Sequence, residues 1–162
     1  MTGSLPPTPP EIEVARLRVD AWLDHALAEN PVVDAVERAA AADLPAIGAR
    51  AQWYVRVHGE DKPVFAVWFT LRQRTLHFET YVMPAPIVNQ ADLYEHLLRR
   101  NQKLHGIAFS IGVEDAVFLA GELPVEAVDE PTLDEALGSL YAATELCFRP
   151  AMRLGFAGSF AG

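Results

Sequence analysis

The chain has 162 residues, 51% hydrophobic and 22% charged, a composition typical of one folded domain and not of a disordered protein. Its formal net charge of -9 argues against a nucleic-acid partner, because nucleic-acid binding needs a basic surface. A single cysteine excludes an internal disulfide and fits a reducing compartment, so we expect a cytoplasmic protein.

The ends of the chain differ in composition from its middle. Residues 1–10 contain four prolines and lack the segments of a secretory signal, so a disordered, polyproline-like arm is expected there. We expect a folded domain over residues 11–156 and a flexible tail over residues 157–162. The longest apolar run, residues 64–69, is far shorter than the roughly 20 residues of a membrane span, so no membrane partner is expected.

The first predicted element is a helix over residues 11–29. Its apolar residues recur at helical spacing, and Pro31 ends it because the residue before a proline avoids the α region. Residues 31–50 leave two interpretations open. They fit either a short strand at Val32 and Val33 or a second helix through the alanines at positions 39–42.

Three strands with short connections come next and predict an antiparallel meander. Apolar and polar residues alternate over residues 53–58 and 75–83, as in strands with one buried face. Residues 64–71 are apolar on both faces, which predicts a central strand that is covered on both sides.

The remaining chain predicts two helices separated by two strands. Asn89 is the expected N-cap of a helix whose apolar stripe, including Leu98 and Leu104, ends at Gly106. Strands are expected over residues 107–111 and 116–122. The last helix is expected to begin at Thr132 and to be broken or kinked by Pro150. The order α-βββ-α-ββ-α defines a single α+β domain with an antiparallel sheet packed by helices.

Charge is distributed unevenly along the chain. Residues 1–48 and 106–162 have net charges of -5 and -7, whereas residues 49–105 have a net charge of +3. This pattern fits either solvated faces of mixed sign or electrostatic matching between subunits or with a partner.

No motif for catalysis, metal binding or phosphate binding occurs in the sequence. The five histidines include no pair at the spacing of a helical metal site, and no glycine-rich phosphate loop is present. Cys147 lies beside the apolar stripe of the last helix, which predicts a buried, unreactive thiol. We therefore expect no enzyme, cofactor or metal.

Asn101 and Arg56 are polar residues with two possible roles each. Asn101 falls on the apolar stripe of its helix and must find partners, most simply in the backbone of a loop or strand end. Arg56 lies on the polar face of its strand, where an ion pair with Glu79 across the sheet is the simplest role. A ligand role is the alternative for both residues.

Several segments resemble the YbjN family of bacterial proteins: WYVR at residues 53–56, TYVMPAP at 80–86, YEHLLRRN at 94–101, DAVFLAGE at 115–122, with Gly106 and residues 133–138. The family is described as sensory transduction regulators. Its fold resembles that of type III secretion chaperones, which are small, commonly homodimeric domains that hold partially unfolded client proteins. No catalytic residues are attributed to the family.

The resemblance implies a non-catalytic regulatory or chaperone-like domain that binds a second copy of itself and an unidentified protein client. A client is expected to lie across the first helix and the sheet surface. The alternative is a small-molecule sensor or an undetected enzyme with a pocket between the second helix and the sheet. Candidate ligand or partner contacts are Arg56, Tyr81, Tyr94, Arg99 and Asn101.

Overall fold

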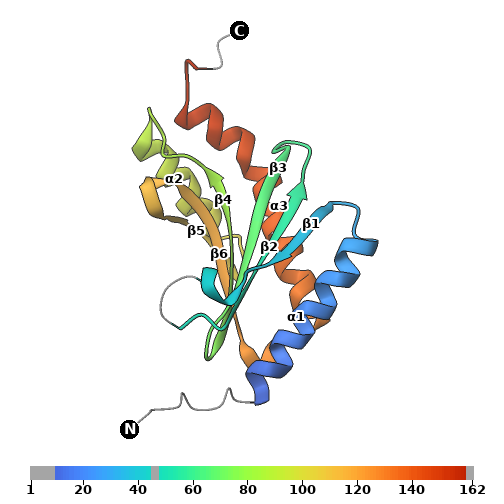
Figure 1. The fold of residues 1–162 in the computed structure, drawn as a ribbon. Helices are drawn as coiled ribbons and strands as arrows, with labels where there is room; N and C mark the ends of the chain where they lie inside the picture. The colour runs from blue at the N-terminus through green and yellow to red at the C-terminus, as the bar shows by residue number, and fades with distance from the viewer. Residues whose placement is uncertain (1–9, 45–47, 160–162) are drawn as a thin grey trace.

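The computed structural model describes residues 10–44 and 48–159, which form three α-helices and a six-stranded antiparallel sheet (Figure 1). The helices are α1 (Pro10–Glu29), α2 (Gln90–Asn101) and α3 (Glu130–Gly155). The strands are β1 (Val33–Arg38), β2 (Ala51–His58), β3 (Val64–Leu71), β4 (Thr75–Met83), β5 (Ile107–Ile111) and β6 (Val117–Pro124). The α+β class is confirmed. The predicted arm, apart from Pro10, and the last three residues of the predicted tail lie outside the described residues.

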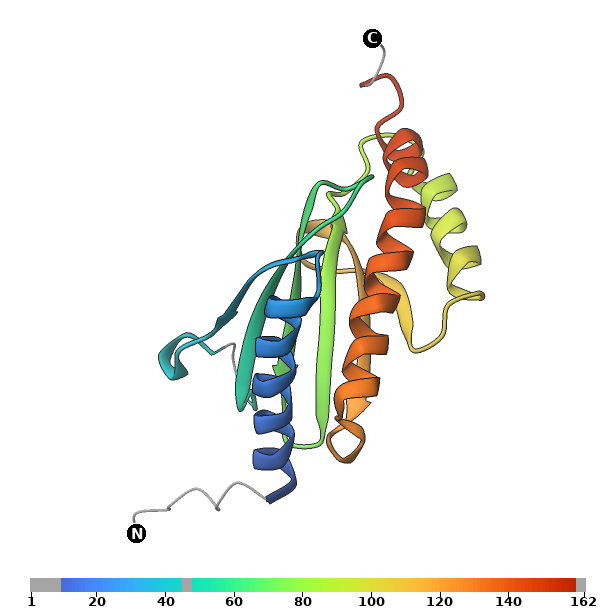
Figure 2. The same cartoon turned by 90° about the vertical axis from the view of Figure 1, so that its right-hand side faces the viewer.

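The sheet has the order β1-β2-β3-β4-β6-β5, so that β1 and β5 are its edge strands. Its residues alternate between two faces, and Trp53, Val55 and Val57 of β2 are buried on one of them. In Figure 2, α1 and α3 lie along that face, with α2 beside the C-terminal half of α3. We call this side of the sheet the covered face and the opposite side the open face.

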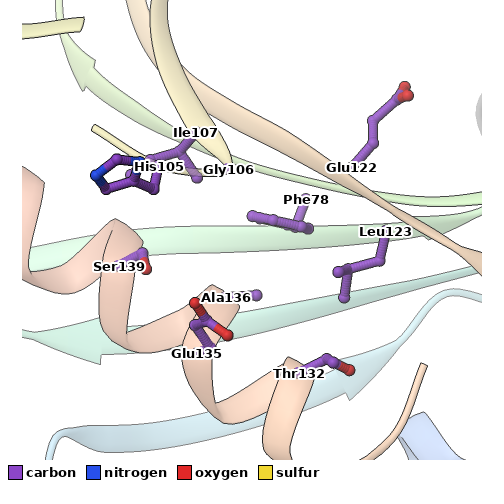
Figure 3. A pocket seen from close by; sticks show the side chains of 10 residues that line it. All are labelled: Phe78, His105, Gly106, Ile107, Glu122, Leu123, Thr132, Glu135, Ala136 and Ser139. Carbon is purple, nitrogen blue, oxygen red and sulfur yellow. The ribbon is translucent and has the colours of Figure 1, made fainter. Parts of the chain in front are cut away.

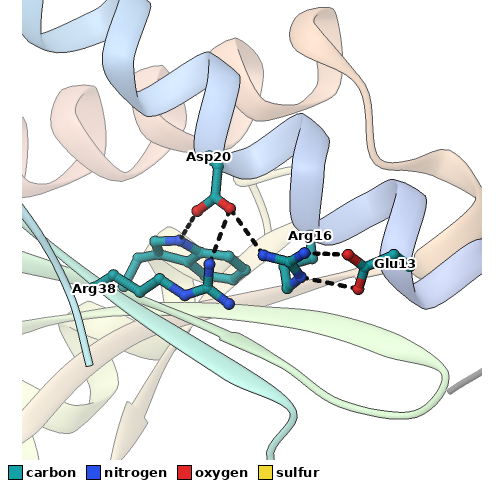
Figure 4. A network of polar contacts seen from close by, with 5 residues as sticks. Glu13, Arg16, Asp20 and Arg38 are labelled. Atoms are coloured by element: carbon teal, nitrogen blue, oxygen red, sulfur yellow. Dashed lines mark hydrogen bonds and ion pairs between the residues drawn. The ribbon is translucent and has the colours of Figure 1, made fainter. Parts of the chain in front are cut away.

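Two hydrogen bonds from tryptophans to carboxylates fix α1 on the covered face. Trp53 of β2 donates its indole N–H to Asp20 of α1 at 2.7 Å, and Trp22 of α1 donates to Asp134 of α3 at 2.7 Å. Because a buried indole N–H needs a partner, these bonds set the position of α1 over the sheet. The polar network around Asp20, drawn in Figure 4, also includes Glu13, Arg16 and Arg38.

Residues 31–50, for which the sequence allowed either a strand or a helix, contain a strand. β1 spans Val33–Arg38, pairs with β2, and is followed by a 3-10 turn at Ala41–Asp43. A helix through the alanines is therefore wrong, the strand is longer than predicted, and the sheet has six strands where five were expected. The reason lies in tertiary packing. Val33 and Val36 are buried or partly buried when this segment pairs with β2, and the free energy of that burial outweighs the helix propensity of the alanines.

The last helix begins earlier than predicted. Asp129 is the N-cap of α3 and accepts a hydrogen bond from the backbone N–H of Thr132 at 3.0 Å, while the Thr132 hydroxyl accepts from the Asp129 N–H at 3.0 Å. Thr132 thus belongs to the first turn and is not the cap. The helix continues through Pro150 as far as Gly155.

The helix α2 also differs from its prediction in two ways. Asn89 is the N-cap residue of α2, as predicted, but it has a left-handed conformation, and its side chain donates to the Leu154 carbonyl at 2.9 Å and makes no cap hydrogen bond to α2. Leu98, expected on the buried stripe, is 67% exposed, and Leu104 lies beyond the end of the helix.

Candidate functional site

The open face of the sheet carries apolar residues of β3. The sequence predicted that this face of the strand would be covered. In β3, Phe65, Val67 and Phe69 are buried on the covered face, whereas Val64 and Trp68 point to the open face and are 56% and 38% exposed. None of the three α-helices covers this second face of β3, so the prediction of two covered faces is wrong. The reason is that the helices α1 and α3 both lie on the other side of the sheet (Figure 2).

Four aromatic side chains form two contacting pairs on the open face. Tyr54 of β2 and Trp68 of β3 are cross-strand partners with ring centroids 5.0 Å apart. Tyr81 of β4 and Phe118 of β6 are cross-strand partners with centroids 5.6 Å apart and nearly perpendicular rings. Because Trp68 and Tyr81 remain 38% and 41% exposed, large apolar groups are accessible to a partner on this face.

Negative side chains outnumber positive ones on the open face. The ring of His77 lies 3.4 Å from the carboxylate of Glu79 (Nε2 to Oε2), and their hydrogen bond lowers the pKa of Glu79. His58 pairs with Asp34, at 2.7 Å between Nδ1 and Oδ1. Among the described strands, the charged residues of this face are the acidic Asp34, Glu37, Glu79 and Glu122 and the basic Arg56.

Lys62, in the turn between β2 and β3, holds the part of β4 that presents Tyr81. Its ammonium donates to the carbonyls of Tyr81 and Val82 at 2.5 and 3.0 Å, where the register between β4 and β6 shifts. Aromatic rings of Phe65, Tyr81 and Phe148 lie 5.1–5.9 Å from the same nitrogen. Burial lowers the pKa of Lys62 to about 8. Sequence reasoning missed this residue because its partners are backbone carbonyls and rings on distant segments.

Of the five predicted contact residues, Arg56 and Tyr81 lie on the open face. Arg56 is paired in register with Ala66 of β3 and Ala35 of β1, whereas Glu79 of β4 is paired with Trp68. The predicted ion pair between Arg56 and Glu79 is absent from the described residues. The reason is that β3 separates the two strands and the two residues belong to different cross-strand rows.

The other three predicted residues belong to α2 and do not join Tyr81 in a pocket. Asn101 accepts a hydrogen bond from the Phe109 N–H at 2.7 Å and donates to the Phe109 carbonyl at 3.2 Å. A backbone partner is confirmed, although it lies in the middle of β5 and not in a loop or at a strand end. Arg99 is exposed to solvent and donates to Glu95 of the same helix at 2.8 Å. Tyr94 alone lines a cavity.

That cavity is an apolar groove of about 290 Å³ between α2 and β5. It takes the place of the predicted pocket between the second helix and the sheet, with a more apolar lining than expected. Leu98 and Ile111 are 67% and 52% exposed at its border. Its lining residues are Tyr94, Leu97, Leu98, Phe109, Ser110, Ile111 and Val117.

A smaller pocket lies between the first half of α3 and the strands β4, β5 and β6 (Figure 3). Its volume of about 120 Å³ is below the roughly 300 Å³ of ordinary ligand pockets. Its polar side chains include His105, Glu135 and Ser139, and in Figure 3 Glu122 points away from them. This arrangement does not assemble a nucleophile with an oriented base.

Outside these pockets, the described residues include few side chains suited to catalysis or metal binding. Cys147 is buried as predicted, and burial raises the pKa of its thiol, which disfavours the reactive thiolate. Within residues 10–44 and 48–159, no group of three or more His, Cys, Asp or Glu side chains is placed to hold a metal ion. In the same part of the chain, no helix combines the length and apolar character that crossing a membrane requires.

The fold and the site together define an α+β domain with an antiparallel sheet that is covered on one face. Residues 18–151 match the YbjN family, described as "Putative bacterial sensory transduction regulator". The match includes most of the chain, and this protein belongs to the YbjN family. The resemblance proposed from the sequence is confirmed.

Relatives of the chain occur among mycobacterial proteins that are named as uncharacterized. A protein of Mycobacterium tuberculosis is 30% identical over 112 residues, which cover 69% of this chain and 61% of the relative. A protein of Mycobacterium leprae is 27% identical over 105 residues, covering 65% of this chain and 57% of the relative. The chain thus matches less than two thirds of the length of these relatives.

One solved structure with a similar arrangement is the heterodimeric complex of ExoU with SpcU from the type III secretion system of Pseudomonas aeruginosa. The similarity covers 82% of this chain and 96% of the matched chain, with a TM-score of 0.47 and 15% sequence identity.

Proposed function

We propose that the protein is a non-catalytic regulatory domain that binds another protein through the open face of its sheet. The observation that carries the proposal is the exposure of Trp68 and Tyr81 on a sheet whose opposite face is packed by α1 and α3. Exposed aromatic side chains at the centre of a surface contribute much of the binding energy in protein interfaces.

The charge of the open face indicates the chemistry of the partner. Four carboxylates and one arginine surround the aromatic pairs, so a partner segment with apolar side chains and a net positive charge complements this face. Complementary charge favours association and register, while the aromatic contacts supply the affinity.

Protein capture with matched variants tests this proposal. The whole chain, Trp68→Ser, Tyr81→Ser and the control Leu146→Ser are used as baits, because Leu146 is 60% exposed on α3, away from the open face. A captured protein is then purified and its dissociation constant is measured for each bait. We expect both open-face variants to weaken binding about thirtyfold or more, and Leu146→Ser to leave it unchanged. Equal effects of all three variants, or capture no greater than by an unrelated domain of equal charge, contradict the proposal.

We further propose that the domain acts in the cytoplasm as a homodimer. The support is the YbjN resemblance together with the single, buried cysteine, which suits a reducing compartment. Light scattering of the purified protein at micromolar concentration is expected to give twice the chain mass of 17.8 kDa. A monomer at high micromolar concentration contradicts the dimer.

The groove between α2 and β5 favours a second candidate function, the sensing of an apolar small molecule. Its volume of about 290 Å³ is close to that of small-ligand pockets, and Tyr94 supplies a hydroxyl group in a mostly apolar lining. A ligand at 100 times its dissociation constant stabilises a protein by about 2.7 kcal/mol. A thermal shift with a metabolite that is lost in Leu97→Gln would favour sensing. Open-face variants that abolish partner capture would favour protein binding.

A further inference from the structure

A row of residues across the open face places two aromatic rings between two carboxylates. Glu37 of β1 is the cross-strand partner of Tyr54, Tyr54 is the partner of Trp68, and Trp68 is the partner of Glu79 in β4. Directly opposed residues in a sheet lie on one face with Cβ atoms about 5 Å apart. The pair of Tyr54 and Trp68 therefore has a negative group on each side.

The same rings form one wall of a hollow at the end of the open face. The connection after β1 borders this hollow, whose volume is about 440 Å³. The lining residues are Glu37, Arg38, Ala39, Ala40, Asp43, Gln52, Tyr54 and Trp68.

The charge of this hollow is negative. The guanidinium of Arg38 donates to Asp20 of α1 at 3.0 Å and lies 5.8 Å from the ring centre of the buried Trp53, so its charge is partly neutralised there. Glu37 and Asp43 form no ion pair with any described residue. A cation that enters the hollow therefore finds aromatic faces and two carboxylates without a counter-ion.

We infer that this hollow binds an arginine side chain of the partner protein. A guanidinium is planar and weakly hydrated, so it stacks on an indole ring while its N–H groups donate to carboxylates. A lysine ammonium has the charge but lacks the planar face, and it is expected to bind more weakly. The inference rests on the proposed function, since it names the side chain that the open face recognises.

The tryptophans of the chain allow this binding to be observed at one residue. Trp22 and Trp53 are 4% and 1% exposed and donate their indole N–H groups to Asp134 and Asp20. Trp68 is the third tryptophan and is 38% exposed. Its indole N–H signal in a ¹⁵N-labelled sample, assigned by its loss in Trp68→Phe, therefore reports on the hollow.

The probe is the peptide acetyl-Gly-Arg-Gly-amide, and the control peptide has citrulline, which is similar in shape and uncharged, in place of arginine. We expect the arginine peptide to shift the Trp68 signal in a saturable way, with an affinity at least about fivefold higher than that of the citrulline peptide. The Trp22 signal should not move. Equal shifts with both peptides, or no shift of Trp68, would overturn the inference.

Charge-removing variants provide the second part of the test. Glu37→Gln combined with Asp43→Asn is expected to weaken arginine-peptide binding about fivefold, whereas Glu122→Gln, on the same face but outside the hollow, is expected to leave it unchanged. Undiminished binding by the double variant also contradicts the inference. If the peptide fails while Trp68→Ser still abolishes capture of a partner protein, the arginine site is wrong and the proposed protein-binding function stands.

Discussion

The side-chain amide of Asn101 pairs with both backbone polar groups of Phe109, accepting from the N–H at 2.7 Å and donating to the carbonyl at 3.2 Å. Because β5 is an edge strand, these are groups that an added strand would use. Asn101 thus acts at this position as a neighbouring strand would, and it closes part of an edge that lies beside the apolar groove.

Replacement of Asn101 by alanine is expected to leave the Phe109 backbone groups without their partner. We expect the free energy of unfolding in urea to fall by about 1–3 kcal/mol. Lys103→Ala, at an exposed position just after the helix, is the control and should change it by less than about 0.5 kcal/mol. Equal stability of the two variants would show that the pairing contributes nothing.

Asp20 is expected to stabilise the docking of α1 mainly through Trp53. In Asp20→Asn the side-chain oxygen still accepts from the indole, and only the partly exposed arginine pairs lose a charge, so a cost of about 1 kcal/mol is expected. Asp20→Ala also leaves the indole N–H unpaired and should cost about 2–3 kcal/mol. Denaturation followed by tryptophan fluorescence measures both, with Asp24→Ala at an exposed position of α1 as the control.

Lys62 is expected to make stability depend on pH in the alkaline range. Burial lowers its pKa from 10.5 to about 8, so between these values the unfolded chain binds a proton that the folded chain does not. Below pH 8 both states carry the charge and the folded state bears its desolvation cost; as pH rises above 8 that cost disappears and stability increases.

The difference between the wild type and Lys62→Met isolates this effect from other titrating groups. Because the side chain is partly exposed, we expect the wild type to gain only about 1 kcal/mol relative to the variant from about pH 8 to about pH 10. Measurements should stop there, since burial raises the pKa of Tyr81 and its ionisation acts with the opposite sign. A constant difference across this range would contradict the assignment.

Cys147 is expected to react with thiol reagents only after unfolding. Its thiol is buried in α3 and burial raises its pKa, so labelling by a disulfide reagent at neutral pH should be at least about a hundredfold slower than for a free thiol. Denaturant should restore the full rate, which is followed by the absorbance of the released thiol. Fast labelling of the native protein would show that this part of α3 opens readily.

The sequence by itself determined the elements whose burial repeats at a regular spacing. The helical stripe ending in Ala26 and the alternation around Trp53 are local patterns, and patterns of this kind predicted most of the helices and strands. The burial of Cys147 and the backbone partner of Asn101 followed from the same patterns, because a position on an apolar stripe must be packed or paired.

The tertiary structure alone decided which faces are covered and which side chains meet. β1 has little pattern of its own and becomes a strand only beside β2, and the apolar second face of β3 stays open because α1 and α3 lie on the opposite side. The row that joins Glu37 to Glu79 depends on the register of four strands. That register is set by turns and packing among segments distant in sequence, so no local spacing of residues contains it.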